Sequence, residues 1–220
     1  MNSMTQGLLG QLQGQPMNLL GQRLGLGQHQ LSGLLAAAAP LLIGALGREA
    51  RQPAGARSLF GALQRDHMGQ DPQSVLGSAL EGGQQGDKIL GHIFGEREAL
   101  AAQGVAGATG VAPDRARMLL RWLAPVAMAY VAKQLFERRQ QGASVLPPQP
   151  PSPDLLQHKL EQEERQIQQN GGIGGGLLHA VLDRNKDGEL GFSDLLGGFG
   201  GFDGPPPGAP REAGDGTRPS

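Results

Sequence analysis

Oxygen-bearing side chains recur at alternate positions at the start of the stretch Asp183–Asp194, which reads Asp-Arg-Asn-Lys-Asp-Gly-Glu-Leu-Gly-Phe-Ser-Asp. Asp183, Asn185 and Asp187 occupy its first, third and fifth positions. A hard divalent cation such as calcium prefers six to eight oxygen ligands at about 2.3–2.6 Å, and a loop of this length can surround one ion. The stretch therefore predicts a cation-binding loop.

The spacing of this stretch resembles the EF-hand calcium loop. The resemblance implies that Gly188 permits the sharp bend in the sixth position and that Leu190 faces the protein core. Water would enter beside Gly191, and the backbone carbonyl of the seventh residue would be a ligand. The predicted metal ligands are Asp183, Asn185, Asp187, Glu189 and Asp194.

The loop departs from the usual pattern at its closing position. Asp194 stands where glutamate normally binds with both oxygens, and it is one methylene shorter. Arg184 and Lys186 also offset part of the negative charge of the loop. We therefore expect one weak calcium site, with a dissociation constant on the order of 10⁻⁴ M. The alternative is a turn rich in Asp, Asn and Gly that binds no metal.

The loop has a clear helical approach and a poor helical exit. Leu177, Leu178, Val181 and Leu182 have helical spacing, which predicts a short incoming helix. Four glycines interrupt residues 197–201 after the loop, and each costs a helix about 1 kcal/mol relative to alanine. The outgoing helix should therefore be one or two turns long. No second loop of this kind occurs in the sequence, so the site would stand alone or pair with another copy.

The composition excludes several functional classes. Gly accounts for 37 and Pro for 16 of the 220 residues, the formal net charge is −1, and there is no cysteine. A generic nucleic-acid partner, a disulfide and a thiolate metal site are therefore not expected. The N-terminus has no signal-peptide pattern, which predicts a cytoplasmic protein. No catalytic motif or histidine pair at metal-site spacing occurs, so we expect no enzymatic activity.

The chain divides by composition into five segments. The longest apolar stretch, Leu34–Leu46, is too short to span a bilayer, so no transmembrane segment is expected. The predicted segments are a helical domain (1–141), a Pro-rich linker (142–152), a charged helix (153–170), an EF-hand-like segment (171–202) and a disordered tail (203–220).

The charged helix has a recognisable start and a thin apolar stripe. Ser152 is a natural N-cap, and Pro153 suits the first helical position. The stripe consists of Leu155, Leu156, Leu160 and Ile167. We expect this helix to be a solvated spacer or a weak partner-binding helix, and residues 1–141 to fold without it.

Two parts of the helical domain repeat one another. Pro40 and Pro125 lie 85 residues apart, and the same offset aligns Leu34-Leu35 with Leu119-Leu120 and Gly25 with Gly110. Proline inside a helix removes a hydrogen bond and kinks the axis. The copies, about 20–48 and 105–133, predict an all-α fold: a duplicated helical hairpin bundle with kinked helices, followed by a flexible tail that carries the helix-loop-helix calcium motif. The alternative is chance likeness between helices rich in Ala and Leu.

The segment between the two copies carries a family resemblance. The string Ile89–Gly95, within Gly86-Asp-Lys-Ile-Leu-Gly-His-Ile-Phe-Gly, resembles the bacterial domain of unknown function catalogued under number 937. The resemblance covers roughly residues 20–140. It implies a bacterial, helical protein without a known activity.

Six basic residues gather in and after the second copy, and we expect them to form a solvated face: Arg115, Arg117, Arg121, Lys133, Arg138 and Arg139. Contact with an acidic partner or an anionic membrane surface is the alternative. The sequence as a whole predicts a non-enzymatic helical protein in which calcium orders the C-terminal loop and modulates assembly into a homo-oligomer. The competing hypothesis is a structural, self-associating module that binds no physiological metal.

Overall fold

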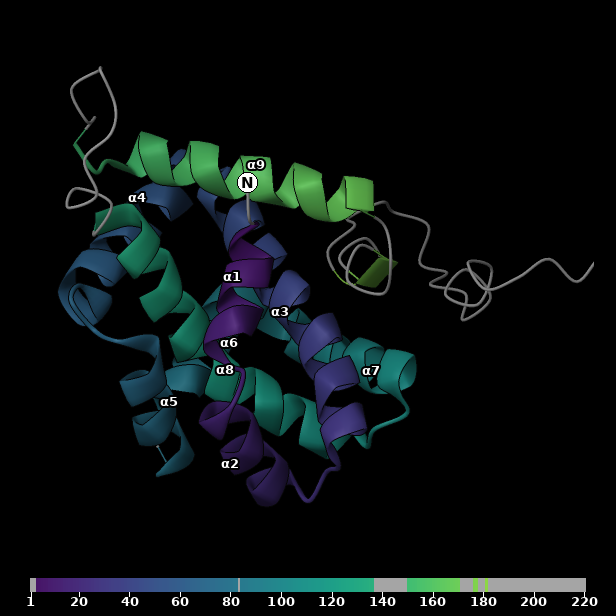
Figure 1. Ribbon diagram of the computed structural model, residues 1–220. Coiled ribbons are helices and arrows are strands. Elements are labelled where there is room, and N and C mark those ends of the chain that lie inside the picture. Colours follow the sequence, from purple (N-terminus) through teal and green to yellow (C-terminus); the bar gives the residue numbers. More distant parts are fainter. Residues whose placement is uncertain (1–2, 83, 137–149, 171–175, 178–180, 182–220) are drawn as a thin grey trace, which may run out of the picture. The chain divides into compact units, whose positions relative to one another are not determined.

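Helices make up the chain wherever the computed structural model describes it, namely over residues 3–82, 84–136, 150–170, 176–177 and 181 (Figure 1). These ranges contain no strand. The all-α class predicted from the sequence is therefore confirmed for this part of the chain.

From α1 to α8 the helices follow one another through short turns. In chain order they are α1 (Met4–Gln11), α2 (Gln15–Leu24), α3 (Gln28–Ala50), α4 (Pro53–Ala62), α5 (Pro72–Leu80), α6 (Gln85–Phe94), α7 (Glu98–Thr109), α8 (Pro113–Phe136) and α9 (Pro153–Asn170). A π-helical turn, η1 (Leu63–His67), extends α4, and a 3₁₀ turn, η2 (Gly95–Arg97), joins α6 to α7.

The two longest helices, α3 and α8, form the centre of the core and pack against each other. Every residue of the range 37–47 in α3 and of the range 123–132 in α8 is buried. A helix that is apolar all round requires neighbours on all sides, and α3 contacts α1, α2, α4, α6, α7, α8 and α9. Among the described residues, α3 alone has the length and composition to cross a membrane, but 78% of its apolar window is buried inside the protein.

Three pairs of positions 85 residues apart have matching places in this core. They are the left-handed glycines that end α2 and α7 (Gly25, φ 63°; Gly110, φ 68°), the first residues of α3 and α8 (Gln28 and Pro113), and the buried prolines inside those helices (Pro40 and Pro125). Both α3 and α8 continue as helices through their internal prolines.

The paired leucines that the 85-residue offset aligns, together with Leu123, are all buried. Leu34, Leu119, Leu120 and Leu123 have no exposed surface, and Leu35 is 4% exposed. The small residues Ala37–Ala39, Ala124 and Ala127 are buried too, whereas Ala36 is exposed.

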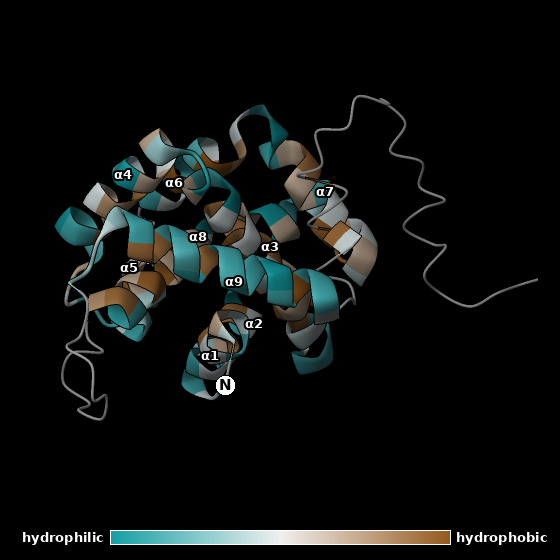
Figure 2. Ribbon diagram, turned by 90° about the horizontal axis from the view of Figure 1, so that it is seen from above, coloured by the Kyte–Doolittle hydropathy of each residue, from teal (hydrophilic) through white to brown (hydrophobic). Residues whose placement is uncertain are grey.

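Helix α9 lies across α3 and α4 within the same compact unit, which extends from Met1 to Gly188. It begins as predicted, because the Ser152 hydroxyl accepts a hydrogen bond from the Leu155 backbone N–H at 3.1 Å. Figure 2 shows its largely hydrophilic outer face. Its inner face buries Leu156, Leu160 and Ile167, so the prediction of a solvated spacer is wrong.

Candidate functional site

All five predicted metal ligands lie outside the described residues: Asp183, Asn185, Asp187, Glu189 and Asp194. Within the part of the chain that is described, no three His, Asp or Glu side chains come together in a way that could hold a metal ion. The part of the predicted site that the structure describes is the segment that leads into the loop.

Those leading residues are held against α7. Gly176, Leu177 and Val181 are helical, and the Leu177 and Val181 side chains are only 1% and 4% exposed. A Cβ atom at Gly104 of α7 would lie 3.1 Å from Cδ2 of Leu177 and 3.4 Å from Cγ2 of Val181. Leu177 and Val181 are four positions apart and so share one face of a helix. Glycine at position 104 permits this close approach.

The Arg97 guanidinium also contacts this segment, at Val181. Its Nη1 atom donates a hydrogen bond to the backbone carbonyl of Val181, with a donor–acceptor distance of 3.2 Å.

Helix α9 carries a buried carboxylate on its inner face. The Glu163 carboxylate accepts hydrogen bonds from the backbone N–H groups of Met4 and Thr5, each at 2.8 Å. These amides belong to the first turn of α1, where they have no partner within the helix. Glu163 is 5% exposed, so a buried carboxylate on α9 caps a helix that starts about 160 residues earlier in the chain.

The next residue of α9 forms an ion pair in which the carboxylate is buried and the arginine is half exposed. Glu164, also 5% exposed, accepts two hydrogen bonds from the guanidinium of Arg51, one of them from Nε at 3.0 Å. A buried carboxylate requires such partners, because an unpaired one would carry a large desolvation cost. Glu163 and Glu164 share helical spacing with the apolar stripe of Leu156, Leu160 and Ile167, but the sequence does not show which groups they meet.

The glycine-rich string between the two copies has a packing role. A Cβ at Gly86 would collide with the backbone carbonyl of Arg121 in α8, so glycine allows α6 and α8 to touch. Asp87 then pairs with Arg121 at 3.0 Å, and Leu90 is fully buried. His92 has a half-exposed side chain 3.6 Å from Glu49. The string therefore joins helices.

The described basic residues of α8 lie at the surface, as the sequence predicted, and several of them also form ion pairs. Three of them form ion pairs with other helices: Arg117 with Glu98 of α7 at 2.9 Å, Arg121 with Asp87 of α6, and Lys133 with Asp71 at the start of α5 at 3.4 Å. Arg115 is exposed, and Arg138 and Arg139 lie outside the described residues. Three of the basic residues that were predicted to be solvated therefore also make tertiary contacts.

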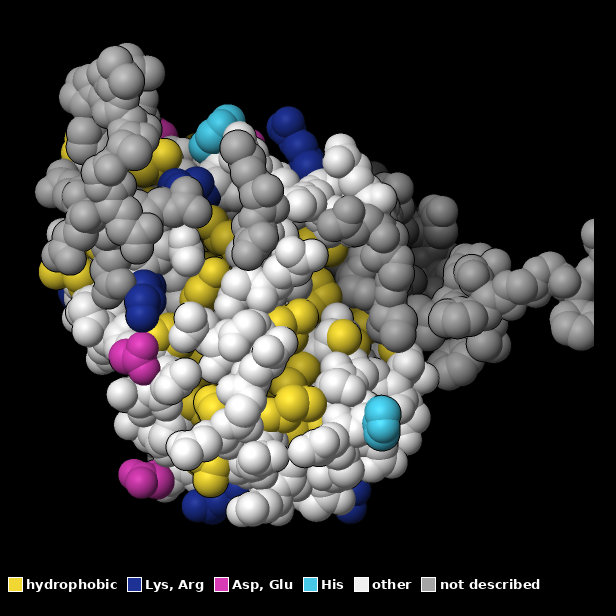
Figure 3. Space-filling view, in the orientation of Figure 1, with side chains coloured by type: hydrophobic (Ala, Val, Ile, Leu, Met, Phe, Trp, Pro, Cys, Tyr) yellow, Lys and Arg dark blue, Asp and Glu magenta, His cyan; other side chains and the backbone are white. Residues whose placement is uncertain are grey.

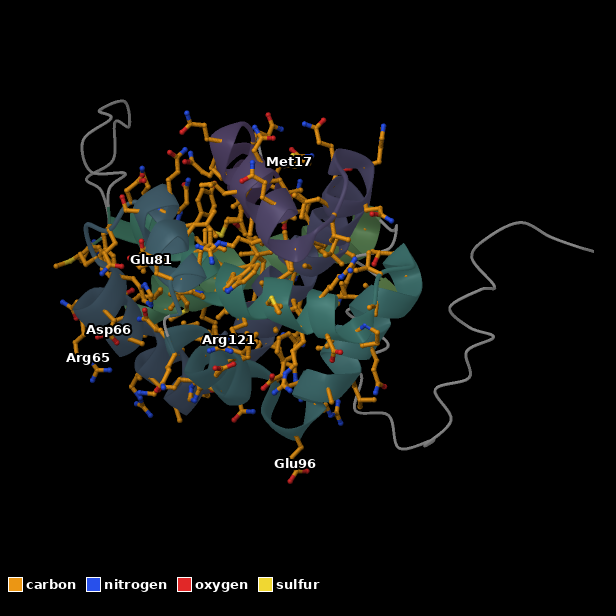
Figure 4. All side chains as sticks on the ribbon, turned by 90° about the horizontal axis from the view of Figure 1, so that it is seen from below. Met17, Arg65, Asp66, Glu81, Glu96 and Arg121 are labelled. Carbon is orange, nitrogen blue, oxygen red and sulfur yellow. The ribbon has the colours of Figure 1, made fainter. Side chains whose placement is uncertain are left out.

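His67 is a buried titratable group that the sequence did not single out. It ends the π-helical turn η1, is 2% exposed, and has no hydrogen-bond partner at Nδ1. Burial lowers the pKa of His67, and the charge of Asp66 opposes this effect. Arg65 and Asp66 lie at the outer edge of the molecule (Figure 4), so the charges nearest in sequence are in solvent.

Comparison with known protein families gives one match over most of the helical unit. Residues 6–134 match the family described as "Bacterial protein of unknown function (DUF937)". The chain belongs to this family. Helix α9, the segment docked on α7 and the predicted calcium loop all follow the matched region. No curated protein and no solved structure matches the chain.

Proposed function

We propose that this DUF937 protein is a non-enzymatic, calcium-binding helical protein. One calcium ion binds weakly to Asp183, Asn185, Asp187, the backbone carbonyl of Glu189 and Asp194, and it orders the loop that these residues form. The ordered loop modulates assembly of the protein. A cytoplasmic location and the absence of a nucleic-acid partner stay predictions from the sequence.

The observation that carries this proposal is the register of oxygen-bearing residues directly after a helical segment. Leu177 and Val181 are helical and buried, and Asp183 follows two residues after Val181. A calcium loop of this type requires a fixed incoming helix and then side-chain oxygens at the first, third and fifth positions. The helical, buried residues Leu177 and Val181 support the first condition, and the spacing of the sequence supports the second.

Hydrogen exchange of the whole chain tests the proposal. Millimolar calcium should slow amide exchange between residues 177 and 196, and magnesium should do so less, because its octahedral shell suits such loops poorly. Asp183→Ala should abolish the protection, whereas Asp203→Ala, a carboxylate beyond the loop, should leave it unchanged. Equal exchange with and without calcium in the wild-type protein would refute calcium binding.

A second candidate function is self-association through a neutral face. Arg23 is the only charged residue between positions 4 and 47 if histidine is neutral, and Leu19 on α2 is 49% exposed. Figure 3 shows apolar side chains among uncharged ones at the centre of this face. Charged residues are depleted in the cores of protein interfaces. If self-association is the function, Leu19→Lys should lower the mass measured by light scattering, and calcium should not change that mass.

We also propose that the helical unit arose by duplication of a kinked hairpin. The matched glycine caps, helix starts and internal prolines of α2–α3 and α7–α8, all at the same 85-residue offset, support this origin. Packing of α3 against α8 is the arrangement expected of two equivalent central helices.

A further inference from the structure

The surface beneath α9 receives a helix that carries carboxylates beside its apolar stripe. The first backbone amides of α1, at Met4 and Thr5, meet one carboxylate, and the Arg51 guanidinium meets the other. Between them, Gly47 presents the bare backbone of α3 to α9. We refer to Met4, Thr5, Gly47 and Arg51 together as the α9-binding surface.

The fit between this surface and α9 is close. A Cβ at Gly47 would lie 3.2 Å from the Leu160 carbonyl oxygen and 3.4 Å from Oε2 of Glu164, so glycine lets the two backbones approach. Leu160 is fully buried, and Glu163 and Glu164 follow it on the same side of the helix. The surface therefore selects one helix face by its shape and by its charge.

Helix α9 reaches this surface through a long connection. Helix α8 ends at Phe136 and α9 begins at Pro153, so residues 137–152 join them. Sixteen residues can span up to about 50 Å. The family match also ends before α9, at residue 134. A connection of this length allows α9 to reach the surface of its own chain or that of a neighbouring chain.

We propose that the α9-binding surface accepts α9 from a second copy of this chain, so that two copies exchange their α9 helices and form a reciprocal dimer. Identical groups meet in the closed monomer and in the exchanged dimer, and such exchange is a low-cost route to a dimer. This assembly needs neither calcium nor the neutral face of α2.

The balance between the two forms depends on the connection and on the protein concentration. A helix on a short flexible connection has an effective concentration on the order of millimolar at its own surface. The closed monomer therefore prevails in dilute solution. The exchanged dimer forms when copies are concentrated, or when α9 fits a neighbouring surface better than its own.

Reversing the ion pair between Arg51 and Glu164 creates that second condition. Arg51→Glu spoils the surface and keeps an intact α9, whereas Glu164→Arg spoils α9 and keeps an intact surface. In either variant alone, every pairing of α9 with the surface brings like charges together. In an equimolar mixture, exchange between the two full-length variants brings opposite charges together at both surfaces.

The variants are combined in urea, refolded together and measured by light scattering and thermal unfolding. We expect the mixture to have twice the mass of one chain and to unfold at a higher temperature than either variant alone. The double variant Arg51→Glu/Glu164→Arg restores the pair within one chain and should keep the mass of one chain. A mixture that also keeps the mass of one chain would overturn the exchange of α9.

A matched control reverses an ion pair whose helices have no room to exchange. Arg117 of α8 pairs with Glu98 of α7, and only residues 110–112 separate these two helices. A mixture of Arg117→Glu and Glu98→Arg should keep the mass of one chain. If this mixture doubles its mass as well, reversed charges cause association in general, and the proposal is wrong.

A further mixture avoids the reversed pair altogether. Full-length Arg51→Glu, with its intact α9, is combined with full-length Glu163→Gln/Glu164→Gln, whose surface is intact and whose own α9 is weakened. One α9 can then dock on the other chain, and we expect twice the mass of one chain. If the double variant with the reversed pair does not fold, this mixture decides, and a single-chain mass rejects the proposal.

Discussion

Replacing Glu163 by glutamine would test whether α9 holds the start of α1 in place. Glu163 accepts hydrogen bonds from two backbone amides, Met4 N–H and Thr5 N–H, through its two oxygens. Glutamine has nearly the same shape but keeps only one acceptor. Its NH₂ group would then face a backbone N–H, and one buried donor of α1 would lose its partner.

The magnitude follows from the groups that change. A hydrogen bond to a charged group contributes about 1.5–3 kcal/mol, and a negative charge at a helix N-terminus in a partly buried place contributes up to about 2 kcal/mol. Relief of the desolvation of a buried carboxylate offsets part of this loss. Glu163→Gln should therefore lower the free energy of unfolding by about 2–4 kcal/mol.

The assay is equilibrium unfolding in urea of wild-type protein, Glu163→Gln and a matched control, Glu161→Gln. Glu161 is on the same helix, but its carboxylate accepts from Gln157 of its own helix at 2.8 Å. The control should change the free energy of unfolding by less than about 0.5 kcal/mol. Equal losses in the two variants, or a loss below about 1 kcal/mol for Glu163→Gln, would show that the cap of α1 does not stabilise the fold.

Two further predictions concern the core and its buried histidine. Leu120→Ala should lower the free energy of unfolding in urea by about 2–5 kcal/mol, because it is a large-to-small change in a fully buried place. Arg121→Ala removes a partly exposed ion pair with Asp87 and should lower it by about 1 kcal/mol or less. Similar losses for both variants would contradict the assignment of Leu120 to the core. Burial lowers the folded-state pKa of His67, so the unfolded state binds its proton more tightly and the free energy of unfolding should fall as pH drops below the ordinary value of 6.5. Urea titrations between about pH 7.5 and 5 should show a smaller decrease for His67→Gln than for wild type, and equal decreases would exclude His67 as the cause.

The central helices could be predicted because their determinants are local in the sequence. The start of α9 at Ser152 and Pro153 followed from capping chemistry, and its buried residues Leu156, Leu160 and Ile167 belong to the apolar stripe seen in the sequence. Helix caps and apolar stripes act over a few residues, so a single sequence contains them in full.

The role of α9 could not be read in the same way, because its partners are distant in sequence. In the sequence, Glu163 and Glu164 are typical of a solvated helix. Only the fold shows that they accept hydrogen bonds from Met4, Thr5 and Arg51. Adjacent carboxylates on an apolar stripe indicate burial only when a donor on another element is known. The sequence therefore predicted the helix and missed what it covers.

The string Gly86–Gly95 between the two copies could also be predicted only in part. Its composition predicted a helix, but the reason for Gly86 is the backbone of Arg121 on another helix. The calcium ligands, by contrast, were predicted from spacing within one short stretch. They stay a prediction, because they lie outside the described residues.

A calorimetric titration of the full-length protein with calcium measures most directly whether this chain binds the ion. One site with a dissociation constant on the order of 10⁻⁴ M is expected, and Asp183→Ala should abolish the heat because it removes the first carboxylate of the loop. If the wild-type protein and Asp183→Ala give the same heat at millimolar calcium, the loop does not bind the ion and the proposed function is wrong.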